Sequence, residues 1–537
     1  MDTIRCRFVC AVLFLLLILS MMTPPTAIAQ EAEPNQETEN LEKLCLVWGC
    51  VKYTHPAYLS GQRDWDADLL SLIKSVREAQ TDEKVNEILR EYVEALGPFD
   101  YGTDFIDAAW SGLEENQKVF PAQTDWRSDA EYLGAELSQV LSQISEIPTV
   151  YRGNAPVFSS PSSPDGITVR FDNEQVYENM DYEDDGYRLL GLFRLWNAIE
   201  YFYPYLDVLD SDWHELLPSM IRRMLDGSGR QSYQLTLYSL TARLQDAHAV
   251  WADVMPLLEE IGRYCVPASW MYINGQIVVS KAYEACLLQP GDVILTMNGS
   301  DMQEIISRRR EYISVTDETK LINAMGYYLL RSPEQKIDLT ILRGEDEISL
   351  TIQGLERFYA ARVLPDRSHH ILEGNIGLIQ PAYLGAAGDI RKVMDEFSDT
   401  NGLIIDLRQP SAVTMHEAFS EYFVKARQPF ALWRYPSWTV PGGYAQYDVS
   451  YIGGSGLKYD QPVVLLIDER TQSHGEYTAM ALSMGGNVTL MGANTVGSDG
   501  NVTLLAMPDG NIVQFSGWGV LTAEGERTQR IGIAPDI

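Results

Sequence analysis

A serine lies where an apolar run ends and a helical pattern begins, a position in which a hydroxyl can act as a nucleophile. The run 471–476 (TQSHGE) places Ser473 between the apolar stretch 463–467 and a helical pattern over 475–484. N–H groups at a helix start favour negative charge on an attacking oxygen and on an oxyanion. No G-x-S-x-G surrounds Ser473, so the sequence does not support a nucleophile elbow of the α/β-hydrolase type. The position also suits an ordinary helix N-cap.

A nucleophilic serine needs a base, and histidine suits that task because its unperturbed pKa is ~6.5. His474 is adjacent to Ser473, and a neighbour in sequence rarely folds back onto the preceding hydroxyl. His248 stands in the run LQDAH at 244–248 and is the other candidate. We interpret the remaining histidines as structural or surface residues: His55, His214, His369, His370 and His416.

The elements that must position Ser473 follow an α/β pattern from Glu373 onward. Apolar runs at 376–379, 403–407, 463–467 and 488–491 predict buried strands. Upstream, the segment 263–356 changes to short apolar runs, and its stretch 287–299 (LLQPGDVILTMNG) resembles the PDZ domain. That resemblance implies a β-rich module that takes an extended peptide end by strand addition.

Two further segments resemble each other. The run 46–56 (LVWGCVKYTHP) is similar to 195–204 (LWNAIEYFYP), and in each copy a second tryptophan follows the first by 17 residues. We predict a duplicated helix pair in which Asp64 and Asp212 cap the second helices and the tryptophans lie in the core. The loop-rich stretch 148–185 predicts a linker between the copies.

Together these motifs resemble the C-terminal processing and tricorn-core serine peptidases. The resemblance rests on T-x-S-x-x-E at Ser473, the run 492–500 (GANTVGSDG), the end run 532–537 (GIAPDI), the upstream PDZ-like module and the N-terminal WG-x-x-KY-x-HP. It implies a multidomain α+β protein. The expected parts are an N-terminal helical domain (41–147), a linker (148–185), a helical part carrying His248 (186–262), a PDZ-like domain (263–356) and an α/β, crotonase-like core carrying Ser473 (367–537).

The resemblance assigns the nucleophile to Ser473 and, through a D-x-H motif at 246–248, the general base to His248. The Ser/Lys branch of the family places a lysine 25 residues after the nucleophile, where this chain has Ser498. No lysine follows Ser473, so a Ser/Lys dyad at that position is excluded. Ser498 is instead a candidate hydrogen-bonding relay.

The remaining site groups are open at this point. The family's carboxylate position falls on Gln529, which can orient an imidazole but cannot offset its charge. Asp499, Glu524 and Glu526 are alternative orienters. For the oxyanion we expect backbone N–H groups of His474 and of Ser411 or Ala412, in a run (406–412) that lacks the glycines of many relatives.

The composition of the chain favours some classes of binding partner and argues against others. Asp and Glu number 75 against 41 Lys and Arg, a formal charge of −34, which argues against a nucleic-acid partner. No metal-ligand spacing and no H-E-x-x-H occur, so neither a metal nor another cofactor is implied. The expected partner is a peptide or an unfolded protein substrate, with neutral or basic segments favoured by the acidic charge.

The first residues have the pattern of a secretory signal peptide. Residues 1–29 carry Arg5 and Arg7, an apolar run and a small-residue end at Ala29, and 30–40 is an acidic spacer. We expect cleavage after Ala29 and a secreted or periplasmic protein; an uncleaved membrane anchor is the alternative. The leading hypothesis is thus a secreted serine endopeptidase. The alternative is a catalytically inactive peptide-binding protein of the same fold.

Overall fold

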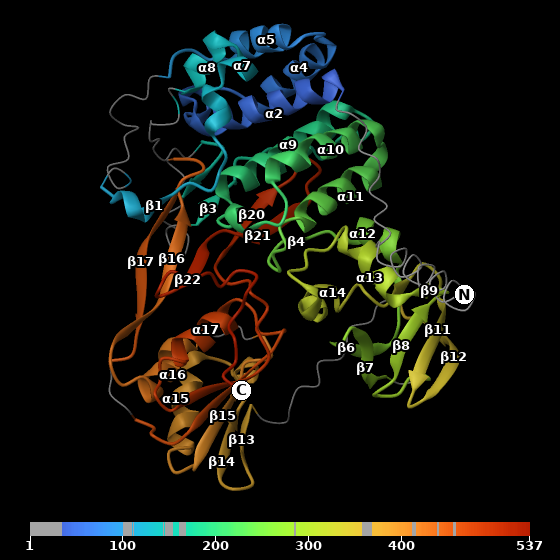
Figure 1. Ribbon diagram of the computed structural model, residues 1–537, viewed down its shortest axis with the longest axis vertical. Helices are drawn as coiled ribbons and strands as arrows, with labels where there is room; N and C mark the ends of the chain where they lie inside the picture. The colour runs from blue at the N-terminus through green and yellow to red at the C-terminus, as the bar shows by residue number, and fades with distance from the viewer. Residues whose placement is uncertain are drawn as a thin grey trace, which may run out of the picture.

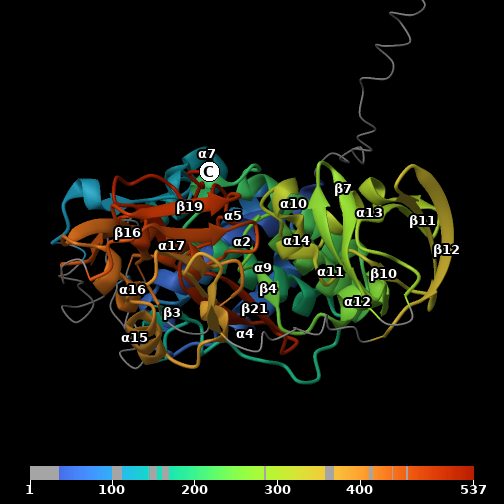
Figure 2. The same cartoon turned by 90° about the horizontal axis from the view of Figure 1, so that it is seen from below.

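The computed structural model describes residues 35–99, 110, 112–142, 144, 154–159, 168–283, 286–356, 368–410, 415–437, 440–454 and 458–537. The predicted signal peptide (1–29) lies outside these residues. Figures 1 and 2 both place a mainly antiparallel sheet (green to yellow) on one side and the helices α15–α17 with a second sheet (orange) on the other. Within the described residues, no helix is both long and apolar enough to cross a membrane.

Two helix pairs build the N-terminal half. The first is α2 (Gln36–Thr54) with α4 (Trp65–Glu78), and the second is α9 (Asp185–Phe202) with α10 (Trp213–Asp226). Asp64 accepts hydrogen bonds from the N–H groups of Asp66 and Ala67, and Asp212 accepts one from His214, so both predicted N-caps are confirmed. The other helices here are α3 (Pro56–Leu59), α5 (Asp82–Ala95), α7 (Ala130–Leu133), α8 (Ala135–Ser142), α11 (Gly229–Ala242) and α12 (Met255–Ile261).

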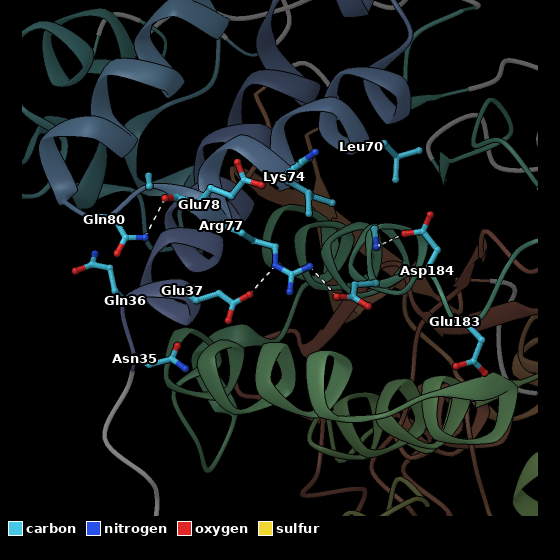
Figure 3. A pocket seen from close by; sticks show the side chains of 14 residues that line it. Asn35, Gln36, Glu37, Leu70, Lys74, Arg77, Glu78, Gln80, Glu183 and Asp184 are labelled. Atoms are coloured by element: carbon cyan, nitrogen blue, oxygen red, sulfur yellow. Dashed lines mark hydrogen bonds and ion pairs between the residues drawn. The ribbon is translucent and has the colours of Figure 1, made fainter.

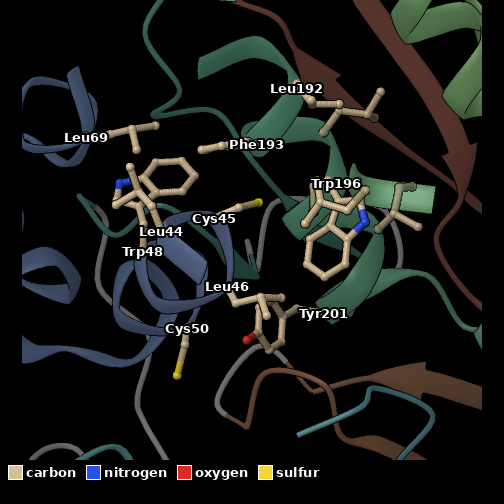
Figure 4. Packing of buried hydrophobic residues seen from close by; sticks show 14 of the residues in the cluster. Leu44, Cys45, Leu46, Trp48, Cys50, Leu69, Leu192, Phe193, Trp196 and Tyr201 are labelled. Carbon is tan, nitrogen blue, oxygen red and sulfur yellow. The ribbon is translucent and has the colours of Figure 1, made fainter. Parts of the chain in front are cut away.

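The core of this half is aromatic and aliphatic (Figure 4). The Trp48 indole donates to the carbonyl of Trp65 at 2.9 Å, and the Trp196 indole donates to that of Trp213 at 3.2 Å. The two helix pairs therefore make the same contact; that they are duplicates stays a prediction. Cys45 and Cys50 are buried free thiols in this core.

Two predicted boundaries differ from the structure. The acidic spacer was expected to run to residue 40, but α2 already begins at Gln36 because Asn35 caps it through the Thr38 N–H. The expected linker 148–185 contains a buried anchor, Glu174, which accepts a 2.6 Å hydrogen bond from Lys52. A buried charge must be paired, so this part of the chain is fixed against the helices.

The segment 263–356 forms a six-stranded antiparallel sheet in the order β12-β11-β8-β7-β6, with β9 paired to β8. Asn298 and Gly299 form a turn between β8 and β9 with positive φ angles of 51° and 79°. The identity of this unit as a PDZ domain stays a prediction. Its elements are β6 (Ala268–Ile273), β7 (Gln276–Ala282), β8 (Val293–Met297), β9 (Ser300–Asp301), α13 (Met302–Arg310), α14 (Leu321–Met325), β11 (Lys336–Arg343) and β12 (Asp346–Gln353), with the small pair β5 (Tyr264–Cys265) and β10 (Arg331–Ser332) beside it.

The C-terminal part contains a five-stranded sheet in the order β13-β14-β15-β18-β19, parallel except for β13. Its strands confirm the four predicted apolar runs. They are β13 (His369–Leu372), β14 (Ile376–Ile379), β15 (Gly402–Asp406), β18 (Val463–Ile467) and β19 (Val488–Gly492), and the helices α15 (Ala387–Glu396), α16 (His416–Phe423) and α17 (His474–Leu482) accompany them.

Two smaller sheets join distant parts of the chain. The first contains β16 (Gln428–Pro436), β17 (Tyr444–Ile452), β22 (Gly519–Thr522) and β1 (Lys118–Val119), so the expected helical domain 41–147 also contributes a strand. The second pairs β20 (Val502–Ala506) and β21 (Ile512–Ser516) with β4 (Val250–Trp251). In it, Trp251 lies opposite Val513, and this pairing brings the segment after His248 to the C-terminal part. A short pair, β2 (Phe158–Ser159) and β3 (Val169–Arg170), lies nearby.

Candidate active site

Ser473 stands in a strained turn between β18 and α17. It is the N-cap of α17 with φ 53° and ψ −122°, a conformation that glycine normally takes. A non-glycine residue held there stores about 1–3 kcal/mol of strain. The sequence did not support a nucleophile elbow, yet the structure has a sharp strand-to-helix turn at this serine. Hydrogen bonds from other segments hold this turn in place, so it forms without the glycines of the G-x-S-x-G motif.

The buried carboxylate of Glu476 is one of the groups that stabilise this turn. Its Oε2 accepts hydrogen bonds from the N–H groups of Ser473 at 3.1 Å and Ser498 at 2.9 Å. Its Oε1 accepts from the Gly497 N–H at 2.8 Å and from the Thr495 hydroxyl at 2.5 Å. Burial raises the pKa of Glu476, and these donors oppose that rise. Glu476 therefore fixes the loop 495–498 against the Ser473 turn.

Ser498 connects this turn to the segment that carries the histidine. Its carbonyl accepts the Ser473 N–H at 3.0 Å, and its fully buried hydroxyl donates to Asp246 Oδ1 at 2.6 Å. A hydrogen bond to an ionised acceptor is stronger than one between neutral groups. Ser498 thus links the Ser473 turn to Asp246, and its role as a relay stays a prediction.

His248 lies in a tight turn after α11, with 6% of its surface exposed. Asp246 Oδ1 accepts the His248 backbone N–H at 3.0 Å and lies 4.0 Å from the ring nitrogen Nδ1. Nδ1 also lies 2.9 Å from the hydroxyl of Ser516, whose N–H donates to Asp246 Oδ2 at 3.0 Å. Burial lowers the pKa of His248, and the Asp246 carboxylate opposes that shift. The imidazole is therefore neutral near pH 7, the form that accepts a proton.

Sequence neighbours of the serine and of the histidine line one cavity. Within the described residues no hydrogen bond joins Ser473 to His248 directly; the path runs through Ser498 and Asp246. A cavity of about 230 Å³ is lined by Ala247 and Ala249, which flank His248, and by Gln472, which precedes Ser473. Nδ1 faces Ser516, and Nε2 makes no hydrogen bond to a described residue.

The structure brings Asp246, rather than Gln529, to the imidazole. Gln529 is 1% exposed and lies close to the Tyr203 hydroxyl, but neither atom of its amide makes a hydrogen bond to a described residue. Asp246 was present in the D-x-H motif, and we did not predict it as a site residue. Its spacing from His248 was the available signal, because a carboxylate two residues before a histidine can fold back onto it.

The three alternative orienters do not contact His248 in the described part of the chain. Asp499 is buried, its Oδ1 accepts the Gly500 N–H, and burial together with the nearby Glu476 raises its pKa well above the usual range. Glu524 and Glu526 are exposed near the turn after β22. These positions leave Asp246 as the carboxylate at the imidazole.

The predicted oxyanion donors are described only in part. Ser411 and Ala412 lie outside the described residues. The backbone N–H of His474, at the start of α17, makes no hydrogen bond to a described residue, as the first N–H groups of a helix commonly do not. The ring nitrogen Nε2 of His474 accepts the Met415 N–H at 3.1 Å. His474 thereby attaches the far end of the expected oxyanion segment to α17.

A larger cavity, of about 790 Å³, lies where α2, α4 and the start of α9 meet (Figure 3). At its centre Arg77 donates to Glu37 at 2.6 Å and to Asp185 at 2.7 Å. None of the described residues that line it is a serine, threonine, cysteine or histidine, so this cavity offers no aliphatic hydroxyl, thiol or imidazole. Among the described residues, no three His, Cys, Asp or Glu side chains are grouped to hold a metal ion.

Comparison with known proteins gives the class of the enzyme. A family model of serine-type peptidases matches the segment that contains the parallel strands and Ser473, and the chain is accordingly a serine-type peptidase. The matching model is that of Peptidase family S41, and it covers residues 375–537. His248 lies upstream of the matched segment.

The solved structures that are similar to this chain have low sequence identity to it. A structure of mature CPAF complexed with lactacystin is 12% identical, with a TM-score of 0.49 over 65% of this chain and 93% of that one. The photosystem II D1 C-terminal processing protease is 16% identical, with a TM-score of 0.38 over 65% and 92%. The tricorn protease is 14% identical, with a TM-score of 0.28 over 78% and 42%. No curated protein matches this chain.

Proposed function

We propose that this chain is an endopeptidase in which Ser473 is the nucleophile and His248 the general base. The observation that carries the proposal is the shared carboxylate of Asp246. It accepts the Ser498 hydroxyl on the serine side and the His248 N–H on the histidine side. Two segments far apart in sequence are thereby held at one place, beside one cavity.

In the proposed reaction His248 Nε2 takes the proton as Ser473 Oγ attacks the peptide carbonyl carbon. The imidazolium then donates that proton to the leaving amine as the peptide bond breaks and an acyl-enzyme remains. Water, deprotonated by the same imidazole, hydrolyses the acyl-enzyme and returns the proton to Ser473. The N–H of His474 faces the start of α17 and is the described donor for the oxyanion.

Asp246 acts here as a positioning residue and as the charge partner of the imidazolium. Its carboxylate oxygen lies 4.0 Å from Nδ1, near enough to stabilise the positive ring. Ser516 accepts from or donates to Nδ1 and keeps the ring in place. This arrangement supplies the negative charge that Gln529 lacks, so the glutamine does not argue against activity.

The wider context is also proposed. We infer an exported protein, from the charged, apolar and small-residue pattern of residues 1–29, with peptide or unfolded protein as its substrate. The segment 263–356 would bind an extended peptide as a PDZ-like module, and the two N-terminal helix pairs would be duplicates. The competing function is a peptide-binding protein without catalysis.

Labelling with a fluorophosphonate probe tests the proposal. Wild type should be labelled at Ser473, and Ser473→Ala should lose the label. Ser483→Ala is the matched control, because Ser483 caps the other end of α17 and its hydroxyl donates only to the Met480 carbonyl. Failure of the folded wild type to label, or labelling that survives in Ser473→Ala, would favour the non-catalytic alternative.

A further inference from the structure

The cavity of about 230 Å³ beside Ser473 and His248 borders both catalytic segments but belongs mainly to other parts of the chain. We infer that it is a specificity pocket for a large uncharged side chain, aromatic or long aliphatic, on the substrate residue whose carbonyl Ser473 attacks. This inference rests on the proposed function and extends it to the substrate.

The cavity lies beside the segments that contain the two proposed catalytic residues. Ala247 and Ala249, the sequence neighbours of His248, line it, and so does Gln472, which precedes Ser473 in the chain. A substrate whose carbonyl lies at Ser473 has its own side chain within a few ångströms of these residues. The cavity is therefore placed for the residue next to the cleaved bond.

The volume of the cavity fits a single large side chain. Clefts that enclose a whole drug-sized ligand measure about 300–1,000 Å³. A volume of about 230 Å³ is below that range and suits a single large side chain. Glycine or alanine would leave most of it unfilled.

The lining of the cavity is uncharged. None of the described lining residues is charged, although the chain as a whole has a formal charge of −34. The walls are aromatic and aliphatic, with Trp251 and Tyr238 stacked at a tilt with ring centroids 4.9 Å apart. A charged occupant would lose its hydration there without gaining a partner. The apolar lining residues are Tyr238, Val250, Trp251, Val254, Leu257, Tyr312, Ile313, Tyr327 and Tyr328.

Two of the polar lining groups hold the site, while the buried Nε1 of Trp251 has no hydrogen-bond partner among the described residues. Asn323 donates to the side-chain oxygen of Gln472 at 2.9 Å, and Ser314 accepts the Asp246 N–H at 2.7 Å. The segment 312–328 thus closes the cavity and at the same time fixes the residues beside the nucleophile and the base. The pocket consequently has a fixed shape, which is what discrimination by size requires.

Val254 provides a sharp test. It lines the cavity and is the N-cap of α12, where its side chain makes no capping bond. Asp and Asn are both favoured N-caps, so Val254→Asp and Val254→Asn should fold at least as well as wild type. The two variants differ by one negative charge in the pocket wall.

The assay uses peptidyl diphenyl phosphonates that carry Phe, Leu, Ala, Lys or Asp at the position of the attacked carbonyl. The rate of covalent labelling of Ser473, located by mass spectrometry, is measured for each probe. One methylene in an apolar pocket changes kcat/KM by about 10–200-fold, so Phe and Leu probes should react at least about tenfold faster than Ala, Lys and Asp probes. Val254→Asp should lower the Phe-to-Lys ratio at least about tenfold, and Val254→Asn should keep the order of wild type.

The possible outcomes distinguish a failure of the pocket assignment from a failure of the proposed serine mechanism. Labelling of Ser473 without a preference for Phe or Leu, or equal Phe-to-Lys ratios in Val254→Asp and Val254→Asn, would overturn the pocket and leave the serine mechanism standing. Absence of labelling by any phosphonate and by the fluorophosphonate would overturn both.

Discussion

The hydroxyl of Ser498 donates a 2.6 Å hydrogen bond to the carboxylate of Asp246, across 252 positions of the chain. Ser498 also accepts the backbone N–H of the proposed nucleophile Ser473, and Asp246 accepts that of His248. The pair therefore sets the relative placement of the two segments that carry the proposed catalytic residues. Neither residue has to touch the substrate to do so.

Asp246→Asn should lower kcat/KM by about 10²–10⁴-fold, because the amide keeps the shape but cannot stabilise the imidazolium. Since Asp246 opposes the lowering of the His248 pKa, the acid limb of the kcat/KM profile should move to lower pH. The measurement is a pH profile of peptide hydrolysis. A loss of activity with the acid limb unmoved would show that Asp246 has only a structural role.

Ser473→Gly should be more stable than Ser473→Ala, although both should be inactive. At φ 53° and ψ −122°, alanine keeps the strain of the serine and glycine relieves it. Glycine also gains entropy in the unfolded chain, about 0.4–1 kcal/mol, so the expected net advantage is about 0.5–2 kcal/mol. Urea unfolding of the two variants measures it, and equal or reversed stabilities would contradict a strained turn.

Acid should destabilise the protein partly through His416. Its ring packs against those of His474 and Tyr477, and burial, with His474 as a second cause, lowers its pKa to about 4. The unfolded state then binds a proton at higher pH, near 6.5, so this stability is present above 6.5 and is lost as the pH falls toward 4. His416→Gln should reduce the loss of unfolding free energy between pH 7 and 4 by about 2 kcal/mol.

Urea unfolding at the two pH values checks this, with His370→Gln as control because His370 is exposed on β13. If both variants lost as much stability as wild type over this range, His416 would not be the acid-sensitive group.

Lys52→Met should lower the free energy of unfolding by about 3–5 kcal/mol, because it leaves the carboxylate of Glu174 buried with one partner fewer. Both side chains are fully buried, and Arg194 ion-pairs with Glu174 at 3.0 Å from the other side. The exposed pair of Lys84 and Glu87 gives the matched control, since Lys84→Met should leave the melting temperature nearly unchanged. Similar melting temperatures for the two variants would remove Glu174 as the anchor of its segment.

The sequence by itself determined the local elements. Apolar runs of four or five residues predicted the strands β14, β15, β18 and β19, because a sheet covered on both faces buries the side chains on both of its sides. Asp64 and Asp212 predicted two helix starts, since N-capping is a property of a single residue and its neighbours.

Only the tertiary structure decided how the site is assembled. The strain at Ser473 arises from contacts with Ser498 and Glu476, and the charge at His248 comes from Asp246. The pairing of β4 with β21 spans about half of the chain. No local pattern encodes such contacts, because a hydrogen bond between distant segments depends on where both are placed once the cores have formed.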